Sequence, residues 1–277
     1  MSFSLRILFK SFIDFFRDDG PILAGSISYF FVMAIFPFCL FLVSIFGYFL
    51  GENREFYNFF LEKLIYFFPE ATSEITKELG TIITYRKIGL FTLLLYGFFS
   101  YQLYLSAEKA INVIFKEKAT RPFLISTLFS LSIVTLMITL LIITFGAISL
   151  IPMFKFLTNF LPGLVISKIT IILVGFILPL FLVAVIATSF YIFLPKKNVK
   201  TRHALIGGLF TALFLEAAKH LFTFYIALKL SNIGTIYGSL SAFIIFVLWV
   251  FYSASIFLIG GEVVHNLGTA KSSDHPS

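Results

Sequence analysis

Charged residues are scarce in this chain. Of its 277 residues, 13% are Asp, Glu, Lys or Arg, whereas an ordinary soluble domain carries about 25%. Hydrophobic residues make up 59%, and the mean hydropathy is +0.99. A water-soluble protein of this composition would have too few polar residues to cover its surface. The composition therefore excludes an ordinary soluble domain and indicates one membrane domain with little outside it.

Residues that build metal, disulfide and nucleophilic sites are also few. Cys39 is the single cysteine, which excludes an intrachain disulfide and a cysteine metal cluster. The histidines form no HxH or HExxH spacing, and neither a GxxxxGK[ST] loop nor a GxSxG elbow is present. We therefore expect no metal, no cofactor and no enzymatic activity.

Long apolar runs make up most of the chain, and 39 of its residues are Phe. A helix needs about 20 apolar residues to cross the hydrocarbon core of a bilayer. Each such helix also satisfies its own backbone hydrogen bonds, which lipid cannot do. The sequence predicts an all-α fold, a polytopic membrane bundle of six transmembrane helices within residues 21–268. The predicted spans are residues 24–50, 88–115, 123–151, 166–194, 203–229 and 236–262.

Three segments outside the spans have patterns of their own. Residues 1–20 mix Phe and Ile with both signs of charge, which is typical of an amphipathic helix lying at the membrane interface. Residues 52–86 place apolar side chains at helical spacing on both sides of Pro69 and predict a helical hairpin facing outward. Residues 269–277 are polar and are expected to be a disordered tail.

Basic residues set the predicted orientation. The second and fourth connections between spans are rich in Lys and Arg, and the positive-inside rule places such loops in the cytoplasm. With six spans, both termini are then cytoplasmic. The net charge of +7 predicts membrane lipids as partners, with anionic headgroups at the cytoplasmic loops and no nucleic acid. The oligomeric state stays open, and a homo-oligomer is allowed.

Several motifs occur in an order and spacing that resemble a known family. They include Asp18-Asp19-Gly20, the segments 107–112, 202–207 and 214–219, and Gly260-Gly261-Glu262. Together they resemble the YihY/virulence factor BrkB family, once labelled ribonuclease BN, from about Asp18 to Leu267. The last of these motifs reads Gly-Ala-Glu in that family, where this chain has Gly260-Gly261-Glu262. The resemblance implies a six-helix inner-membrane protein of bacteria without a settled biochemical activity, for whose relatives transport or export has been suggested.

The sharpest candidate site lies near the middle of the fifth predicted span. Glu216 and Lys219 are three residues apart and therefore share a helix face, which His220 and Thr223 extend. Because a charge at mid-bilayer is costly, we expect this face to point into the bundle and the two charges to neutralise each other in part. One interpretation is a binding site for an ion, a proton or a lipid headgroup. The other is a structural ion pair between helices.

Five further charged residues are expected near the cytoplasmic side. Asp18 and Asp19 precede Gly20-Pro21 and favour a helix cap and turn before the first span. Glu108 and Lys109 favour snorkelling to the interface, and Glu262 favours an anchor at the end of the last span. The alternative is a cytoplasmic polar cluster that acts as a gate.

Two prolines fall within predicted spans, Pro37 in the first and Pro179 in the fourth. Proline frees a backbone carbonyl and kinks a helix. Such kinks serve gating in many transporters and occur without function in other proteins.

Three functional hypotheses follow from these patterns. The leading one is a transporter or exporter of an ion, a small solute or a lipid through a polar cavity in the bundle. The alternative is a non-transporting membrane scaffold that supports envelope integrity. Ribonuclease activity is disfavoured, because the cytoplasmic loops are short and basic and lack the clustered carboxylates that metal-assisted RNA cleavage needs.

Overall fold

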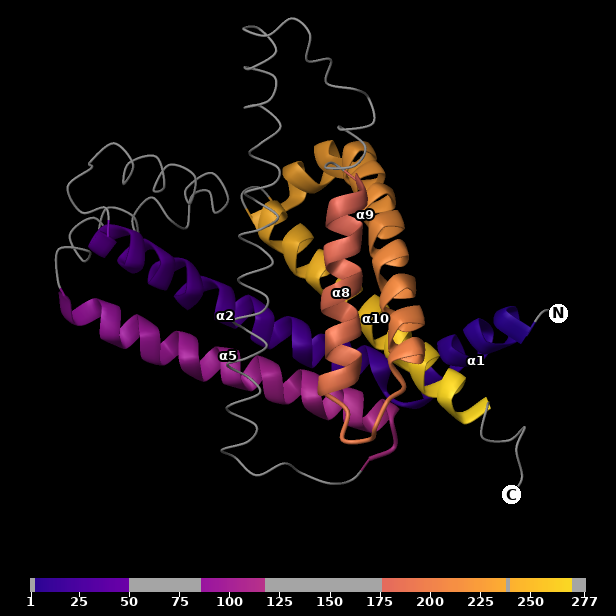
Figure 1. The fold of residues 1–277 in the computed structure, drawn as a ribbon. Coiled ribbons are helices and arrows are strands. Elements are labelled where there is room, and N and C mark those ends of the chain that lie inside the picture. Colours follow the sequence, from indigo (N-terminus) through magenta and orange to yellow (C-terminus); the bar gives the residue numbers. More distant parts are fainter. Residues whose placement is uncertain (1–2, 50–85, 118–175, 238–239, 271–277) are drawn as a thin grey trace, which may run out of the picture. The chain divides into compact units, whose positions relative to one another are not determined.

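The computed structural model describes residues 3–49, 86–117, 176–237 and 240–270. Within these ranges the secondary structure is helical and contains no strand, which confirms the all-α prediction for this part of the chain. The predicted span 123–151, the hairpin 52–86 up to Tyr85 and the tail beyond Ala270 lie outside the described residues. The described helices are α1 (Phe3–Arg17), α2 (Gly20–Phe49), α5 (Arg86–Ile114), α8 (Leu178–Phe193), α9 (Thr201–Tyr237) and α10 (Leu240–Ala270) (Figure 1).

Two described helical segments are long and apolar enough to cross a bilayer. They are Thr201–Phe222 of α9, with a hydropathy of 1.4, and Phe243–Ala270 of α10, with a hydropathy of 2.4. Gly20–Ile35 and Leu178–Phe193 are shorter apolar helices. The number of six spans therefore stays a prediction, while the apolar helices on which it rests are present.

The last two helices continue beyond the ends of the predicted spans. The span predicted to end at residue 229 lies in α9, which continues to Tyr237, and the span predicted to end at residue 262 lies in α10, which continues to Ala270. The boundary of an apolar run marks a change of solvent, but a helix continues wherever its backbone hydrogen bonds can. As a result Glu262 lies inside α10, eight residues before the end of the helix.

The described chain divides into two compact units. The first comprises Met1–Leu23, Ala107–His220 and Ser255–Ser277, and the second comprises Ala24–Ser106 and Leu221–Ala254. The long helices α2, α5, α9 and α10 each contribute to both units.

Small residues let the helices of the first unit approach closely. A methyl group added to Gly208 of α9 would meet the backbone of Ala184 and Thr188 in α8. One added to Gly260 of α10 would meet the side chain of Thr211 in α9. Glycines at such contacts are the usual means by which membrane helices pack backbone against backbone. The contact of α9 with α8 therefore depends on Gly208, and that with α10 depends on Gly260.

Tyr191 of α8 joins the same three helices by polar contacts. The side chain is fully buried, and its hydroxyl lies 2.7 Å from Oγ1 of Thr211. The hydroxyl also donates a hydrogen bond to the carbonyl oxygen of Phe257 at 2.5 Å, and the Tyr191 ring stacks on the Phe257 ring at 5.1 Å. A buried tyrosine of this kind fixes the register of neighbouring helices.

The second unit contains most of α2 and α5, which lie side by side and run in opposite directions (Figure 1). The hydroxyls of Ser26 and Ser106 lie 2.8 Å apart, and the rings of Phe38 and Tyr96 lie 5.3 Å apart. These contacts pair α2 and α5 along their length. Phe222 of α9 contacts Trp249 of α10, with ring centroids 5.2 Å apart.

Candidate functional site

Glu216 of α9 makes the ion pair that its spacing predicts. Lys219 Nζ lies 2.6 Å from Glu216 Oε1, and His220 Nε2 lies 3.4 Å from the same oxygen. The Glu216 side chain is 15% exposed, whereas those of Lys219 and His220 are 49% and 71% exposed. The carboxylate is therefore sheltered, and its two basic partners are open to the surroundings.

The pair lies at the edge between two faces of α9. Gly208, Thr211 and Ala212 are buried on the packed face, while Leu209 and Leu213 are exposed on the other. On the Glu216 side of the helix, Ala212 is 2% exposed and Leu209 is 49% exposed. The side of α9 that carries Glu216 is therefore covered in part and open in part. Thr223 lies in α9, and its side chain is outside the described residues.

Glu216 lies deep along its helix. It is 15 residues beyond Thr201, where α9 begins, so it lies about 22 Å along the helix axis at 1.5 Å per residue. The hydrocarbon core of a bilayer is about 30 Å thick. If α9 crosses a bilayer from its first turn, Glu216 lies within the hydrocarbon region rather than at an interface.

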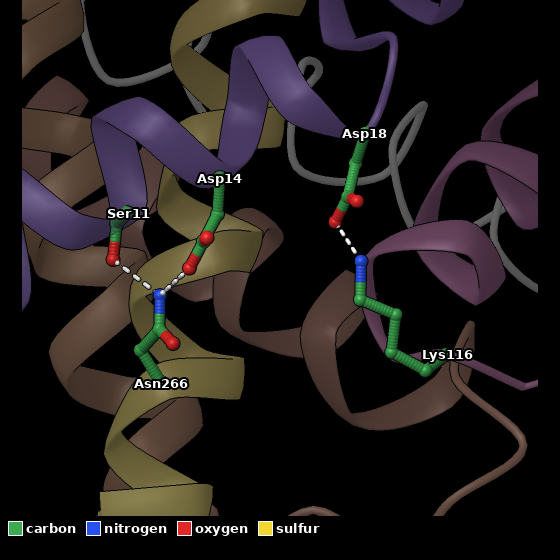
Figure 2. A network of polar contacts seen from close by, with 5 residues as sticks. All are labelled: Ser11, Asp14, Asp18, Lys116 and Asn266. Atoms are coloured by element: carbon green, nitrogen blue, oxygen red, sulfur yellow. Dashed lines mark hydrogen bonds and ion pairs between the residues drawn. The ribbon is translucent and has the colours of Figure 1, made fainter.

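A second set of polar contacts joins α1 to α10 and to the end of α5. Asn266 Nδ2 donates to Ser11 Oγ at 3.1 Å and to Asp14 Oδ2 at 3.0 Å. Lys116, which follows α5, forms an ion pair with Asp18 (Figure 2). These contacts attach the C-terminal half of α1, and the turn that follows it, to α10 and to the end of α5.

The buried carboxylates of this region correct two expectations. Glu108 is 5% exposed and Glu262 is 1% exposed, so neither snorkels to an interface nor serves as an exposed anchor. Lys109 is exposed, and its snorkelling to the interface stays a prediction. The reason is tertiary: neighbouring helices cover the faces of α5 and α10 that carry the two glutamates.

Asp18 and Asp19 form the predicted turn before α2. Asp19 has a φ of 56°, and its carbonyl oxygen accepts hydrogen bonds from the backbone of Ile22 and Leu23. The positive φ separates the end of α1 from the start of α2, and short polar residues tolerate it best. Of the two side chains, Asp18 joins the polar contacts and Asp19 is exposed.

The two prolines occupy different positions in their helices. Pro37 is buried inside α2, which continues on both sides of it. Pro179 follows Leu178, the first residue of α8, and Phe176 and Ile177 before them are in π-helical conformation. Ile177 has helical dihedrals, with φ at −70° and ψ at −43°, so helical backbone lies on both sides of Pro179. Prolines and π-helical turns are common causes of kinks in helices, and the role of Pro179 as a kink stays a prediction.

Sequence reasoning missed several residues that hold this unit together. Tyr191, Thr211 and Asn266 are buried and hydrogen-bonded, and nothing in the local pattern singles them out. One signal was available for Asn266, which is four residues after Glu262 and therefore on the same helix face. Among the described residues no group of three His, Cys, Asp or Glu side chains is arranged to hold a metal ion.

Apolar helices of bilayer-spanning length, with charged groups buried between them, define a helical membrane protein. Comparison with known families agrees, since the profile of the virulence factor BrkB family matches residues 12–276. The chain belongs to this family.

Curated relatives carry the name UPF0761 membrane protein. The one from Azotobacter vinelandii is 29% identical over 96% of this chain and 63% of its own length. A relative from Legionella pneumophila is 26% identical over 90% of this chain and 58% of its own length. A relative from Pseudomonas aeruginosa is 28% identical over 93% of this chain and 61% of its own length. The chain thus spans about three fifths of these relatives. No solved structure matches it.

Proposed function

We propose that this protein moves an ion, a small solute or a lipid across a bacterial inner membrane along a polar path beside Glu216. The observation that carries the proposal is the trio Glu216, Lys219 and His220 on an apolar helix. Two of its members are about half exposed or more, although Thr201–Phe222 is apolar enough to span a bilayer.

Energetics favours a polar path over contact with acyl chains. A charged side chain at the centre of a bilayer costs at least about 2.5–3.5 kcal/mol. Pairing Glu216 with Lys219 reduces that cost, but Lys219 and His220 still keep much of their surface uncovered. A water-accessible path or a polar substrate beside α9 would remove most of the remaining cost.

We expect each charged residue to bind the part of a substrate that has the opposite charge. Glu216 would bind the cationic part of a substrate or take up a proton, and Lys219 would balance it or bind an anionic part. Thr223 would extend the polar face of α9. Bending at Pro37 would let α2 move during gating. No nucleotide-binding loop occurs in this sequence, so we expect the driving force to be a gradient or a partner ATPase.

The test is transport by purified protein in liposomes. We expect vesicles containing the protein to show flux of protons, of Na⁺ or K⁺, or of a fluorescent phospholipid. We expect the flux of the Glu216→Gln variant to be at least about tenfold lower, because the substitution removes a charge that the proposed path requires. Glu117→Gln is the matched control, because it removes a carboxylate that follows the end of α5 and lies outside the Glu216 site.

Equal flux from the Glu216→Gln protein would contradict the assigned site. Absence of all three fluxes from folded wild-type protein would contradict transport and favour the scaffold alternative.

A further inference from the structure

Glu262 is the most thoroughly buried charged residue described in the first unit. Its side chain is 1% exposed, and the residues on both sides, from Gly260 to Val264, are buried as well. Gly261 faces Ile111 and Ile114 of α5, with side-chain atoms 3.3 and 3.5 Å from the position of an added methyl group. The carboxyl group therefore lies in a tightly packed layer that water does not reach.

Neither carboxyl oxygen of Glu262 accepts a hydrogen bond from a donor among the described residues. The side chain within hydrogen-bonding reach is the Asp18 carboxyl group, which cannot donate while it is ionised. Leaving an ionised carboxylate buried without a donor costs several kcal/mol, and a buried carboxyl group avoids this cost by becoming neutral. The described residues offer no metal-binding group of three ligands, which leaves a proton as the simplest ligand.

The charged groups around Glu262 disfavour the ionised form of its carboxyl group. Asp14 and Asp18 of the α1 end and Lys116 after α5 are the charged groups that act on it. Asp18 is already paired with Lys116, and Asp14 accepts a hydrogen bond from the neutral amide of Asn266. With Glu262 ionised, three carboxylates would face a single ammonium group.

We propose that the buried Glu262 carboxyl group carries a proton and donates it in a hydrogen bond to the Asp18 carboxylate, and that this hydrogen bond keeps α1 docked on α10. The proton gives Glu262 a donor, for which the Asp18 carboxylate is the acceptor. Asn266 lies one turn further along α10 and holds Ser11 and Asp14 (Figure 2). The proton and the Asn266 amide therefore attach the same stretch of α1 to the same face of α10.

Other titratable groups occur on the elements packed against Glu262, and a pH response must be separated from theirs. They are Lys10 and Asp14 of α1, Glu108 of α5, Lys116 after α5, Lys197 before α9, His203 of α9 and His265 of α10.

Loss of the proton has a structural consequence with a defined sign. The docked state binds the proton more tightly than the released state, because release brings Glu262 and Asp18 into water. Raising the pH therefore favours release of α1, by about tenfold in the opening equilibrium per pH unit once the released state is deprotonated.

The experiment measures how readily a thiol on the docked face of α1 reacts with maleimide. In a Cys39→Ser background, Ile7→Cys is the reporter, because Ile7 is 8% exposed. Phe12→Cys, on the outer face of α1 at 51% exposure, corrects for the intrinsic pH dependence of the thiol. We expect the ratio of reporter to reference labelling to rise with pH by about tenfold per unit.

Matched variants assign the response to the carboxyl pair. Glu262→Gln mimics the protonated group and should keep the ratio low and independent of pH. Asp18→Asn removes the acceptor and one negative charge, so it should move the rise to a different pH. Infrared spectra of the wild type should contain a protonated-carboxyl band that Glu262→Gln removes. A ratio that does not change with pH in the wild type, or the same rise in Glu262→Gln, would overturn the proposal.

Discussion

Tyr191 shows how a single hydroxyl can hold three helices in place. Its oxygen lies 2.7 Å from Thr211 Oγ1 and 2.5 Å from the Phe257 carbonyl oxygen, at a position that is fully buried. Tyr191→Phe keeps the ring stacking and removes both polar contacts. We expect it to lower the free energy of unfolding by about 1–2 kcal/mol, in the range of buried hydrogen bonds between helices.

The measurement is denaturant-induced unfolding of the purified protein in detergent micelles. Tyr29→Phe is the control, because Tyr29 is 55% exposed and should contribute little through its hydroxyl. Equal effects of the two substitutions would show that the Tyr191 hydroxyl is not a structural centre.

Residues also show what the sequence could and could not predict. The Glu216–Lys219 pair was predicted, because spacing on one helix decides whether two side chains meet. The burial of Glu108 and Glu262 was not, because it depends on which helix covers them. The contacts of α1 with α10 were missed for the same reason, since more than 250 residues separate Ser11 from Asn266.

At the scale of helices, the packing of α8 against α9 depends on a glycine. An added methyl group on Gly208 would lie 2.7 Å from the carbonyl oxygen of Ala184 and 3.0 Å from the backbone nitrogen of Thr188. Backbone atoms cannot rotate away as a side chain can, so the helices would have to separate. We expect Gly208→Ala to destabilise the protein by about 1–3 kcal/mol.

Gly97 of α5 is the matched control for this substitution. No heavy atom lies within 4 Å of the position of its added methyl group. Gly97→Ala should therefore be neutral or stabilise α5 by up to about 1 kcal/mol through helix propensity. Thermal unfolding of both variants in detergent tests the difference. The same sign for both variants would contradict the close contact of α8 and α9.

Helix positions could be predicted from hydropathy, because apolar runs of this length have few alternatives. The predicted spans begin within a few residues of the N-termini of α2, α5, α9 and α10. Helices α9 and α10 each continue eight residues beyond the ends of the predicted spans. Hydropathy marks only the apolar part of a helix, whereas its backbone hydrogen bonds can continue into a polar segment.

For the whole molecule, the distribution of basic residues predicts that both termini are cytoplasmic. Alkaline phosphatase fused after Ala270 should then be inactive, and a green fluorescent protein at the same position should fluoresce. Fusions at Gly80, in the loop predicted to face outward, should give the reverse pattern. An active phosphatase after Ala270 would overturn the orientation.

The central claim is that a polar path, rather than lipid, lies beside Glu216. Leu209 and Phe214 of α9 test it, because both are about half exposed, at 49% and 50%. Leu209 lies two turns before Glu216 on the same side of the helix, whereas Phe214 lies two residues before Glu216 on the opposite side. Their depths along the helix axis from Thr201 are about 12 and 20 Å, so both lie within a hydrocarbon core about 30 Å thick.

The decisive measurement is labelling of Cys39→Ser protein in native membranes with a water-soluble maleimide. The account predicts that Leu209→Cys reacts and that Phe214→Cys does not. Failure of both cysteines to react, when each reacts in denaturant, would contradict it.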